Sequence, residues 1–122
     1  MDQKLKTQTA DYLNLIPVPD YVAEMSVEDT EKAIFQASEE IMDEYPQITQ
    51  TPRMIALQFL YNAEAEVEGT AMMHRQGISD YTVKDVKVVL KREALSPNVL
   101  KIISRLPEMQ NQGAGGRVGQ FI

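Results

Sequence analysis

Hydrophobic residues recur at helical spacing over much of the chain. The first long stretch follows Ser26, whose side chain can cap a helix, and it ends at Pro46, which cannot continue one. Its apolar residues are Ala33, Ile34, Ala37, Ile41 and Tyr45. Acidic residues occupy the other side, so the pattern predicts an amphipathic helix over residues 27–45.

The clearest helix begins at Thr51 and Pro52, because threonine is a favourable N-cap and proline suits the first helical turn. Helix-forming residues continue to about Arg75, and Gly77 follows. In the first half, apolar character extends around most of the circumference, so we expect this half to be the buried centre of the fold. The residues concerned are Met54, Ile55, Ala56, Leu57, Phe59, Leu60 and Tyr61.

Two shorter helices complete the helical pattern. The pattern of residues 8–15 predicts a short helix. The prolines at positions 17 and 19 predict an irregular connection after it. Ser96 and Pro97 repeat the arrangement of a cap followed by proline. A single apolar stripe then predicts a helix that Pro107 ends.

The segment between the last two helices has a different period. Over residues 78–92, alternate positions fall on one face of a strand, and the many β-branched residues favour a strand. A lone strand leaves its backbone donors and acceptors unpaired. We therefore expect this segment either to fold back on itself around residues 79–84 or to pair with a neighbouring subunit.

The last residues are rich in glycine, glutamine and asparagine and bury too little surface to order themselves. We expect a flexible tail whose terminal hydrophobic residues dock onto a partner, or a tail without a role. The fold class predicted is mainly α: a small helical bundle of about four helices with a short extended segment between the last two. The helical domain covers residues 1–106 and the flexible C-terminal tail residues 107–122.

Composition limits the classes of function. The chain has 122 residues, no cysteine and one histidine, which leaves no disulfide, no thiolate zinc site and no cysteine nucleophile. The polar start does not resemble a secretory signal, and no apolar run approaches the ~20 residues that span a bilayer. We expect a cytosolic protein of one domain that does not enter a membrane.

Charge divides the chain into two unlike parts. Residues 1–68 hold 14 acidic and 4 basic residues, whereas residues 69–122 hold 4 acidic and 8 basic residues. A chain polarised in this way can meet a second copy head to tail, with opposite charges in contact. The alternative is that both charged regions are simply solvated.

Catalytic motifs are absent from the sequence. Glu64 and Glu68 stand one helical turn apart and could hold a cation, but no histidine follows either at the spacing of a di-iron site, so we interpret them as a solvated acidic face. No nucleophile elbow or phosphate-binding loop occurs. We predict no catalytic residue, no metal site, no cofactor and no enzymatic activity.

The only basic cluster supports an alternative function. It comprises Lys84, Lys87, Lys91, Arg92, Lys101 and Arg105. A small helical nucleic-acid-binding or regulatory protein could use this patch, around residues 84–105, although Tyr81 is the only aromatic residue interleaved with it.

The order of the segments adds a resemblance. The segments VEDTEKAIFQASEEIMDEYP, TPRMIALQFLYNAEAEVEG, GISDYTVKDVKVVL and SPNVLKIISRL together resemble the small head–tail connector, or adaptor, proteins of long-tailed bacteriophages. The resemblance covers roughly residues 26–106. It is a likeness of pattern, and the segment through Pro19 is longer than the start typical of that family.

The resemblance implies a non-enzymatic virion protein at the head–tail interface, present in the host cytoplasm during assembly. Such proteins form a homo-oligomeric ring, commonly dodecameric, under the portal protein. The ring extends the DNA channel and joins a downstream connector or tail protein; passing DNA would be contacted only non-specifically. The family's portal-binding C-terminal extension corresponds here to residues 112–122. Its expected anchors are Gln112, Arg117, Val118, Phe121 and Ile122.

Charge suggests how neighbouring copies in such a ring would meet. We expect an acidic set on one copy to face a basic set on the next. The acidic residues are Glu39, Glu40, Asp43, Glu64 and Glu68, and the basic residues are Lys84, Lys87, Lys91 and Arg92.

Overall fold

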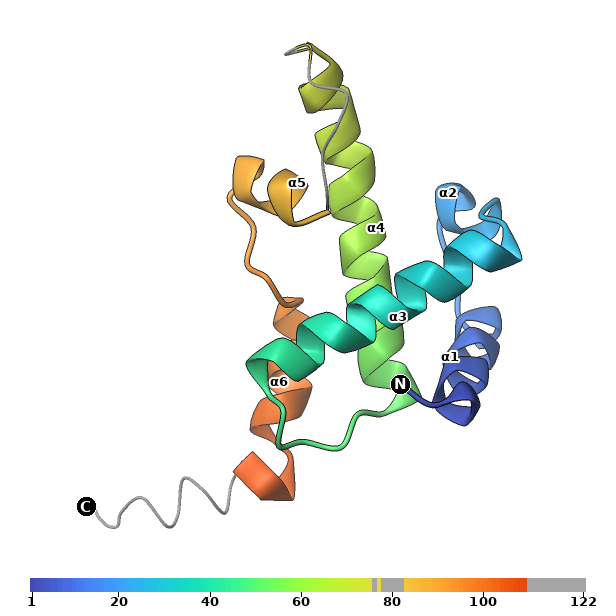
Figure 1. Cartoon of the computed structure of the whole chain (residues 1–122), viewed down its shortest axis with the longest axis vertical. Helices are drawn as coiled ribbons and strands as arrows, with labels where there is room; N and C mark the ends of the chain where they lie inside the picture. Colours follow the sequence, from blue (N-terminus) through green and yellow to red (C-terminus); the bar gives the residue numbers. More distant parts are fainter. Residues whose placement is uncertain (76, 78–82, 110–122) are drawn as a thin grey trace, which may run out of the picture.

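The described residues fold around one long central helix (Figure 1). The computed structural model describes residues 1–75, 77 and 83–109. The helices are α1 (Gln3–Leu15), α2 (Asp20–Ala23), α3 (Val27–Glu44), α4 (Pro52–Arg75), α5 (Val83–Val89) and α6 (Pro97–Ser104). In Figure 1, α3 crosses α4, with α1 and α2 on one side and α5 and α6 on the other. The predicted mainly α fold is confirmed.

Side-chain caps set the starts of the helices, as the sequence indicated. The Ser26 hydroxyl accepts a hydrogen bond from the Asp29 backbone N–H at 3.1 Å, and α3 begins at the next residue. Thr51 caps α4 in the same way through the Met54 N–H, and Ser96 caps α6. Each cap satisfies a backbone donor that the first helical turn leaves without a partner. The predicted starts of α3, α4 and α6 are therefore confirmed.

The N-terminal segment is more helical than the sequence predicted. The first helix begins at Gln3 rather than near residue 8, because the Asp2 carboxylate accepts the Leu5 N–H at 2.7 Å and caps it. The connection expected to be irregular contains the single turn of α2, which starts directly after Pro19.

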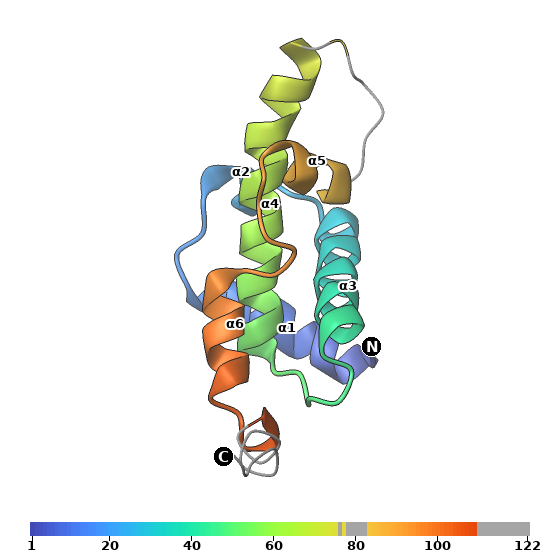
Figure 2. The same cartoon turned by 90° about the vertical axis from the view of Figure 1, so that its left-hand side faces the viewer.

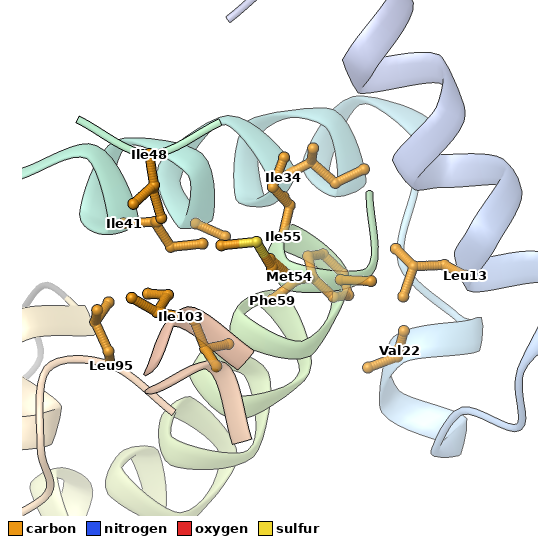
Figure 3. Close-up of a cluster of buried hydrophobic side chains, with 13 residues drawn as sticks. Leu13, Val22, Ile34, Ile41, Ile48, Met54, Ile55, Phe59, Leu95 and Ile103 are labelled. Carbon is orange, nitrogen blue, oxygen red and sulfur yellow. The ribbon is translucent and has the colours of Figure 1, made fainter. Parts of the chain in front are cut away.

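One hydrophobic core lies where α1, α3, α4 and α6 converge (Figure 3). Phe59 and Ile55 of α4 are almost fully buried, and Ile34 of α3 meets them from above in the view of Figure 3. Burying a side chain of this size contributes about 2–3 kcal/mol. The first half of α4 is thus the buried centre of the fold, as its apolar circumference predicted.

The predicted strand is wrong for the part of residues 78–92 that the structure describes. Val83–Val89 form the helix α5, and the chain turns out of it at Leu90 and Lys91. The remaining residues of that prediction, 78–82, lie outside the described residues. The helix satisfies backbone groups locally, whereas a strand needs a partner, and the described part of the chain contains no strand.

Packing explains why a segment rich in β-branched residues becomes helical. Val86 and Lys87 are consecutive and both buried, with 0% and 3% of their surface exposed. Successive residues of a strand point to opposite faces, but those of a helix are only about 100° apart, so α5 can turn both toward α4. Gly69 of α4 allows this approach, because a Cβ there would lie 2.0 Å from Val86 Cγ1.

The end of α5 carries a strained residue. Lys91 has φ +57°, a left-handed conformation that L-residues other than glycine rarely adopt. The Arg92 N–H bonds to the Lys87 carbonyl at 2.8 Å and the Lys91 N–H to the Val88 carbonyl at 3.1 Å. These two bonds form a Schellman motif, in which the position of Lys91 is usually glycine.

Replacing Lys91 with glycine should therefore stabilise the docked α5 by about 0.5–1 kcal/mol, because it removes the strain and keeps the motif. Amide hydrogen exchange at Leu90 and Arg92, together with thermal unfolding, measures the effect. The matched control is Lys101→Gly, at an exposed position inside α6, which should destabilise by about 1 kcal/mol. Faster exchange in the Lys91→Gly protein would contradict the assignment.

The helical body extends slightly past the predicted domain boundary. Residues 107–109 form one more helical turn, and Met109 packs against the core cluster. The Gln47 side-chain amide also lies 3.4 Å from the Met109 sulfur. The body therefore reaches Met109 rather than ending at residue 106.

Candidate functional site

Charged residues from α3, α4 and α5 meet at one place, beside the middle of α4. Five of the residues expected to act between subunits are brought together there within a single chain. They are Glu40 of α3, Glu64 and Glu68 of α4, Lys87 of α5, and Arg92 just after α5.

Lys87 makes the most buried of these ion pairs. Its Nζ atom donates to Glu40 Oε2 at 3.0 Å and to the Ala94 carbonyl at 2.7 Å, and only 4% of its side chain is exposed. Burial lowers the pKa of Lys87, and the hydrogen bond to Glu40 opposes that shift. A lysine is rarely buried without a partner, so the pair with Glu40 keeps α5 against α3 and α4.

Two amide side chains of α4 complete the surroundings of Glu40. Asn62 donates to Glu40 Oε1, and Gln58 donates to Asn62 Oδ1 at 3.0 Å. Gln58 is fully buried, donates to the Ala94 carbonyl at 3.1 Å and accepts the Ser96 N–H at 2.8 Å. Gln58 thereby ties α4 to the turn from which α6 begins.

Arg92 occupies the position where a cation was considered between two carboxylates. Its guanidinium donates to Glu64 Oε1 at 2.8 Å and to Glu68 Oε2 at 2.9 Å. The hydrogen bond to Glu64 is the main cause that raises the pKa of Arg92. The acidic face predicted as solvated is therefore bridged by an arginine of the same chain.

Tyr61 lies close to both cations. The Lys87 Nζ and Arg92 Cζ atoms each lie 5.3 Å from the centre of its ring, within the range of cation–π attraction. The Tyr61 hydroxyl donates to the Glu93 carbonyl at 2.7 Å. Burial is the main cause that raises the pKa of Tyr61.

The polar residues that these contacts join form one set, which we call the internal polar network. It comprises Glu40, Gln58, Tyr61, Asn62, Glu64, Glu68, Lys87, Arg92 and the backbone of residues 93–96.

The internal polar network changes the interpretation of the charges. The pairs of Lys87 and Arg92 were expected between copies, but the structure forms them within one chain. Of the residues expected at a contact between copies, Glu39, Asp43, Lys84 and Lys91 remain on the exposed surface. The basic patch considered for nucleic acid likewise has two of its cations committed to internal ion pairs.

The predicted portal-binding residues lie outside the described residues. This applies to Gln112, Arg117, Val118, Phe121 and Ile122.

The amide side chains at the centre of the internal polar network were not among the residues expected from the sequence to act at a site. Gln58 and Asn62 are one turn apart and share a buried face of α4 with Ala65 and Gly69. Their signal was available: two polar residues within a stretch predicted to be buried around most of its circumference. A buried amide needs partners, so both residues indicated a polar contact at that depth.

Several large hydrophobic side chains remain exposed on the described surface. Phe35 and Met42 lie on α3, Val67 on α4 and Val88 on α5, with exposed fractions between 44% and 70%. Of these, Phe35 and Met42 stand seven residues apart and share one face of α3. A contiguous exposed apolar surface is typical of contacts with other proteins.

An open apolar groove lies between α2, α3 and α4. Its volume is about 310 Å³, and its lining includes Tyr21, Met25, Ala33, Ala63 and Val67. The polar residues of its lining, which include Gln36, Asn62 and Glu66, differ in chemical type, so they do not indicate a particular ligand.

No protein-family model, no curated protein and no solved structure matches the chain. Among residues 1–75, 77 and 83–109, no group of three or more histidine, cysteine, aspartate or glutamate residues has the geometry to hold a metal ion. Over the same residues, no helix is long and apolar enough to cross a bilayer.

Proposed function

We propose that this chain is a non-enzymatic structural adaptor, a head–tail connector that forms a ring under the portal of a tailed bacteriophage. In this proposal the ring extends the DNA channel and joins the capsid to a downstream connector or tail protein. The four sequence segments that resemble that family support the proposal. The observation that carries it is the exposure of large apolar side chains on helices α3 and α5.

The internal polar network supports a role in assembly because it fixes the position of α5 before any partner binds. It holds α5 against α4 and leaves the outer faces of α3 and α5 to contact other molecules. A preformed body loses little conformational entropy when it binds, which favours docking onto an equally preformed ring. The C-terminal residues would supply the second contact, with the portal protein.

Binding through many tails would make the joint durable. A tail that binds weakly alone would act at high effective concentration when one ring presents many copies of it together. The apolar anchors would be Val118, Phe121 and Ile122, with Gln112 and Arg117 as polar ones.

Deleting residues 112–122 should leave the helical body folded and abolish binding to portal rings of the same phage. The fold is checked by circular dichroism and thermal unfolding, and binding by co-sedimentation and electron microscopy. The double variant Phe121→Ser, Ile122→Ser should lose most of the binding, whereas the control Gln120→Ala should keep it. A truncated protein that still decorates portal-bearing capsids would refute the proposed role of the tail.

A further inference from the structure

One exposed side of α3 carries two apolar residues among mainly acidic ones, and Met42 there also lines a groove with the start of α1. Phe35 and Met42 are 44% and 46% exposed and stand seven residues apart, so they lie on one face of the helix. Glu31, Glu39 and Asp43 are exposed beside them. Lys32 is exposed on the same side and pairs with Glu28 of its own helix at 3.2 Å. We call this set the α3 stripe.

The outer side of α5 carries the opposite combination. Val88 is 70% exposed, and Lys84 precedes it by one helical turn on the same face. Lys91 is exposed just beyond the end of the helix, and Asp85 is exposed near its start. We call Lys84, Val88 and Lys91 the α5 knob. Lys87, the remaining basic residue of this helix, is buried in the internal polar network.

The α3 stripe and the α5 knob face in different directions. Glu40 of α3 turns toward α5, because it accepts the hydrogen bond of Lys87 at 3.0 Å. Met42 is two residues further along, which is about 200° around the helix axis, so it turns away from α5. One chain cannot bring these two surfaces together, but two copies can.

We infer that the α3 stripe of one copy binds the α5 knob of a second copy. The contact places Val88 against Phe35 and Met42, with Lys84 and Lys91 opposite the acidic residues of the stripe. Each surface has exposed apolar side chains at its centre, and the charges around them are predominantly acidic on α3 and predominantly basic on α5, which is the complementarity expected of a specific contact. This inference rests on the proposed function, since it identifies how copies of the adaptor meet.

The symmetry of this contact follows from the two surfaces being different. A contact between unlike surfaces is heterologous, and it repeats from copy to copy until it closes into a ring or continues as a filament. Two acidic stripes would repel each other, as would two basic knobs. A symmetric dimer through either surface is therefore disfavoured.

The absence of cysteine from the sequence makes a crosslinking test clean. Met42→Cys and Val88→Cys are prepared as separate proteins, mixed, and treated with a short bismaleimide, both free at high concentration and bound to portal rings. The expected product is a crosslink between the two variants, with neither variant crosslinked to itself. A single chain carrying both substitutions should give a ladder of multimers.

The control pair is Leu15→Cys with Val88→Cys. Leu15 is 82% exposed on α1 and belongs to neither surface, so this pair should give no more than background crosslinking. Charge reversal provides a second readout. Lys84→Glu or Glu39→Lys alone should lower the crosslink yield roughly threefold, and both changes in one chain should restore it.

Each outcome decides between the two proposals. Crosslinks of Met42→Cys or Val88→Cys to themselves, at the yield of the mixture, would overturn the heterologous contact. Decorated portal rings without the mixed crosslink would also overturn it, while the adaptor function would stand. The mixed crosslink in a protein that never binds portal would support the contact and count against the portal-docking function.

Discussion

Replacing Gln58 with leucine should lower the free energy of unfolding by about 2–4 kcal/mol, although the two side chains are similar in size. Leucine cannot accept the Ser96 N–H or donate to Asn62 Oδ1, so buried polar groups would lose their partners. A buried donor or acceptor without a partner costs about 1–3 kcal/mol each. Because Gln58 joins α4 to the start of α6, the loss should also loosen α6.

Chemical denaturation monitored by circular dichroism measures this effect, and amide exchange at Ser96 and Leu100 localises it. The control is Gln8→Leu, at an exposed position of α1, which should change stability by less than about 0.5 kcal/mol. Equal stabilities of the two variants would show that the hydrogen bonds of Gln58 contribute nothing net.

Replacing Gly69 with alanine should displace α5 from α4 and cost about 2 kcal/mol, the range expected for overpacking a tight contact. Alanine inside a helix ordinarily stabilises by about 1 kcal/mol relative to glycine. Here the added Cβ would lie 2.0 Å from Val86 Cγ1, so one helix must move away from the other. Faster amide exchange at Leu90 and Arg92, with α3 unaffected, would report the displacement.

A second substitution tests the steric cause. Val86→Ala removes the two methyl groups that meet the new Cβ and leaves the Val86 Cβ at 3.0 Å, a tight but tolerable contact. The Gly69→Ala, Val86→Ala protein should therefore exchange more slowly in α5 than Gly69→Ala alone. If Gly69→Ala instead raises the thermal stability, as in an unobstructed helix, the close packing of α5 on α4 is disproved.

Local chemistry made the long helices predictable. Ser26 and Thr51 cap α3 and α4 in the structure as their side chains predicted, and the proline after each helix or at its first turn marks the boundaries. These signals act over three or four residues, so they can be recognised without knowing the rest of the fold.

The α5 segment could not be predicted in the same way. Its many β-branched residues suit a strand, and its helical state depends on Gly69 and Glu40, which lie far away in the sequence. β-propensity is weak compared with such packing, and tertiary context overrides it. The presence of Gly69 inside the helical pattern of α4 was a local sign that another element approaches there.

The sequence identified several charged residues of the candidate site, but it did not show which residue pairs with which. The opposite charges of the two parts of the chain predicted contacts between copies, whereas the pairs of Lys87 and Arg92 form within one chain. Whether Lys87 reaches Glu40 of its own chain or of another depends on where α5 lies, which charge counting cannot determine. The role of Gln58 required knowing that the backbone of residues 94–96 passes beside α4 (Figure 2).

The seating of α5 has a geometric consequence for an array of copies. Val86 rests directly on the α4 backbone at Gly69, and Lys87 is tied to Glu40, so α5 has one fixed orientation relative to α3. In the contact that we propose between the α3 stripe and the α5 knob, that orientation would set the angle between successive copies. The curvature of such an array, and the diameter at which it closes, would then be determined inside each subunit.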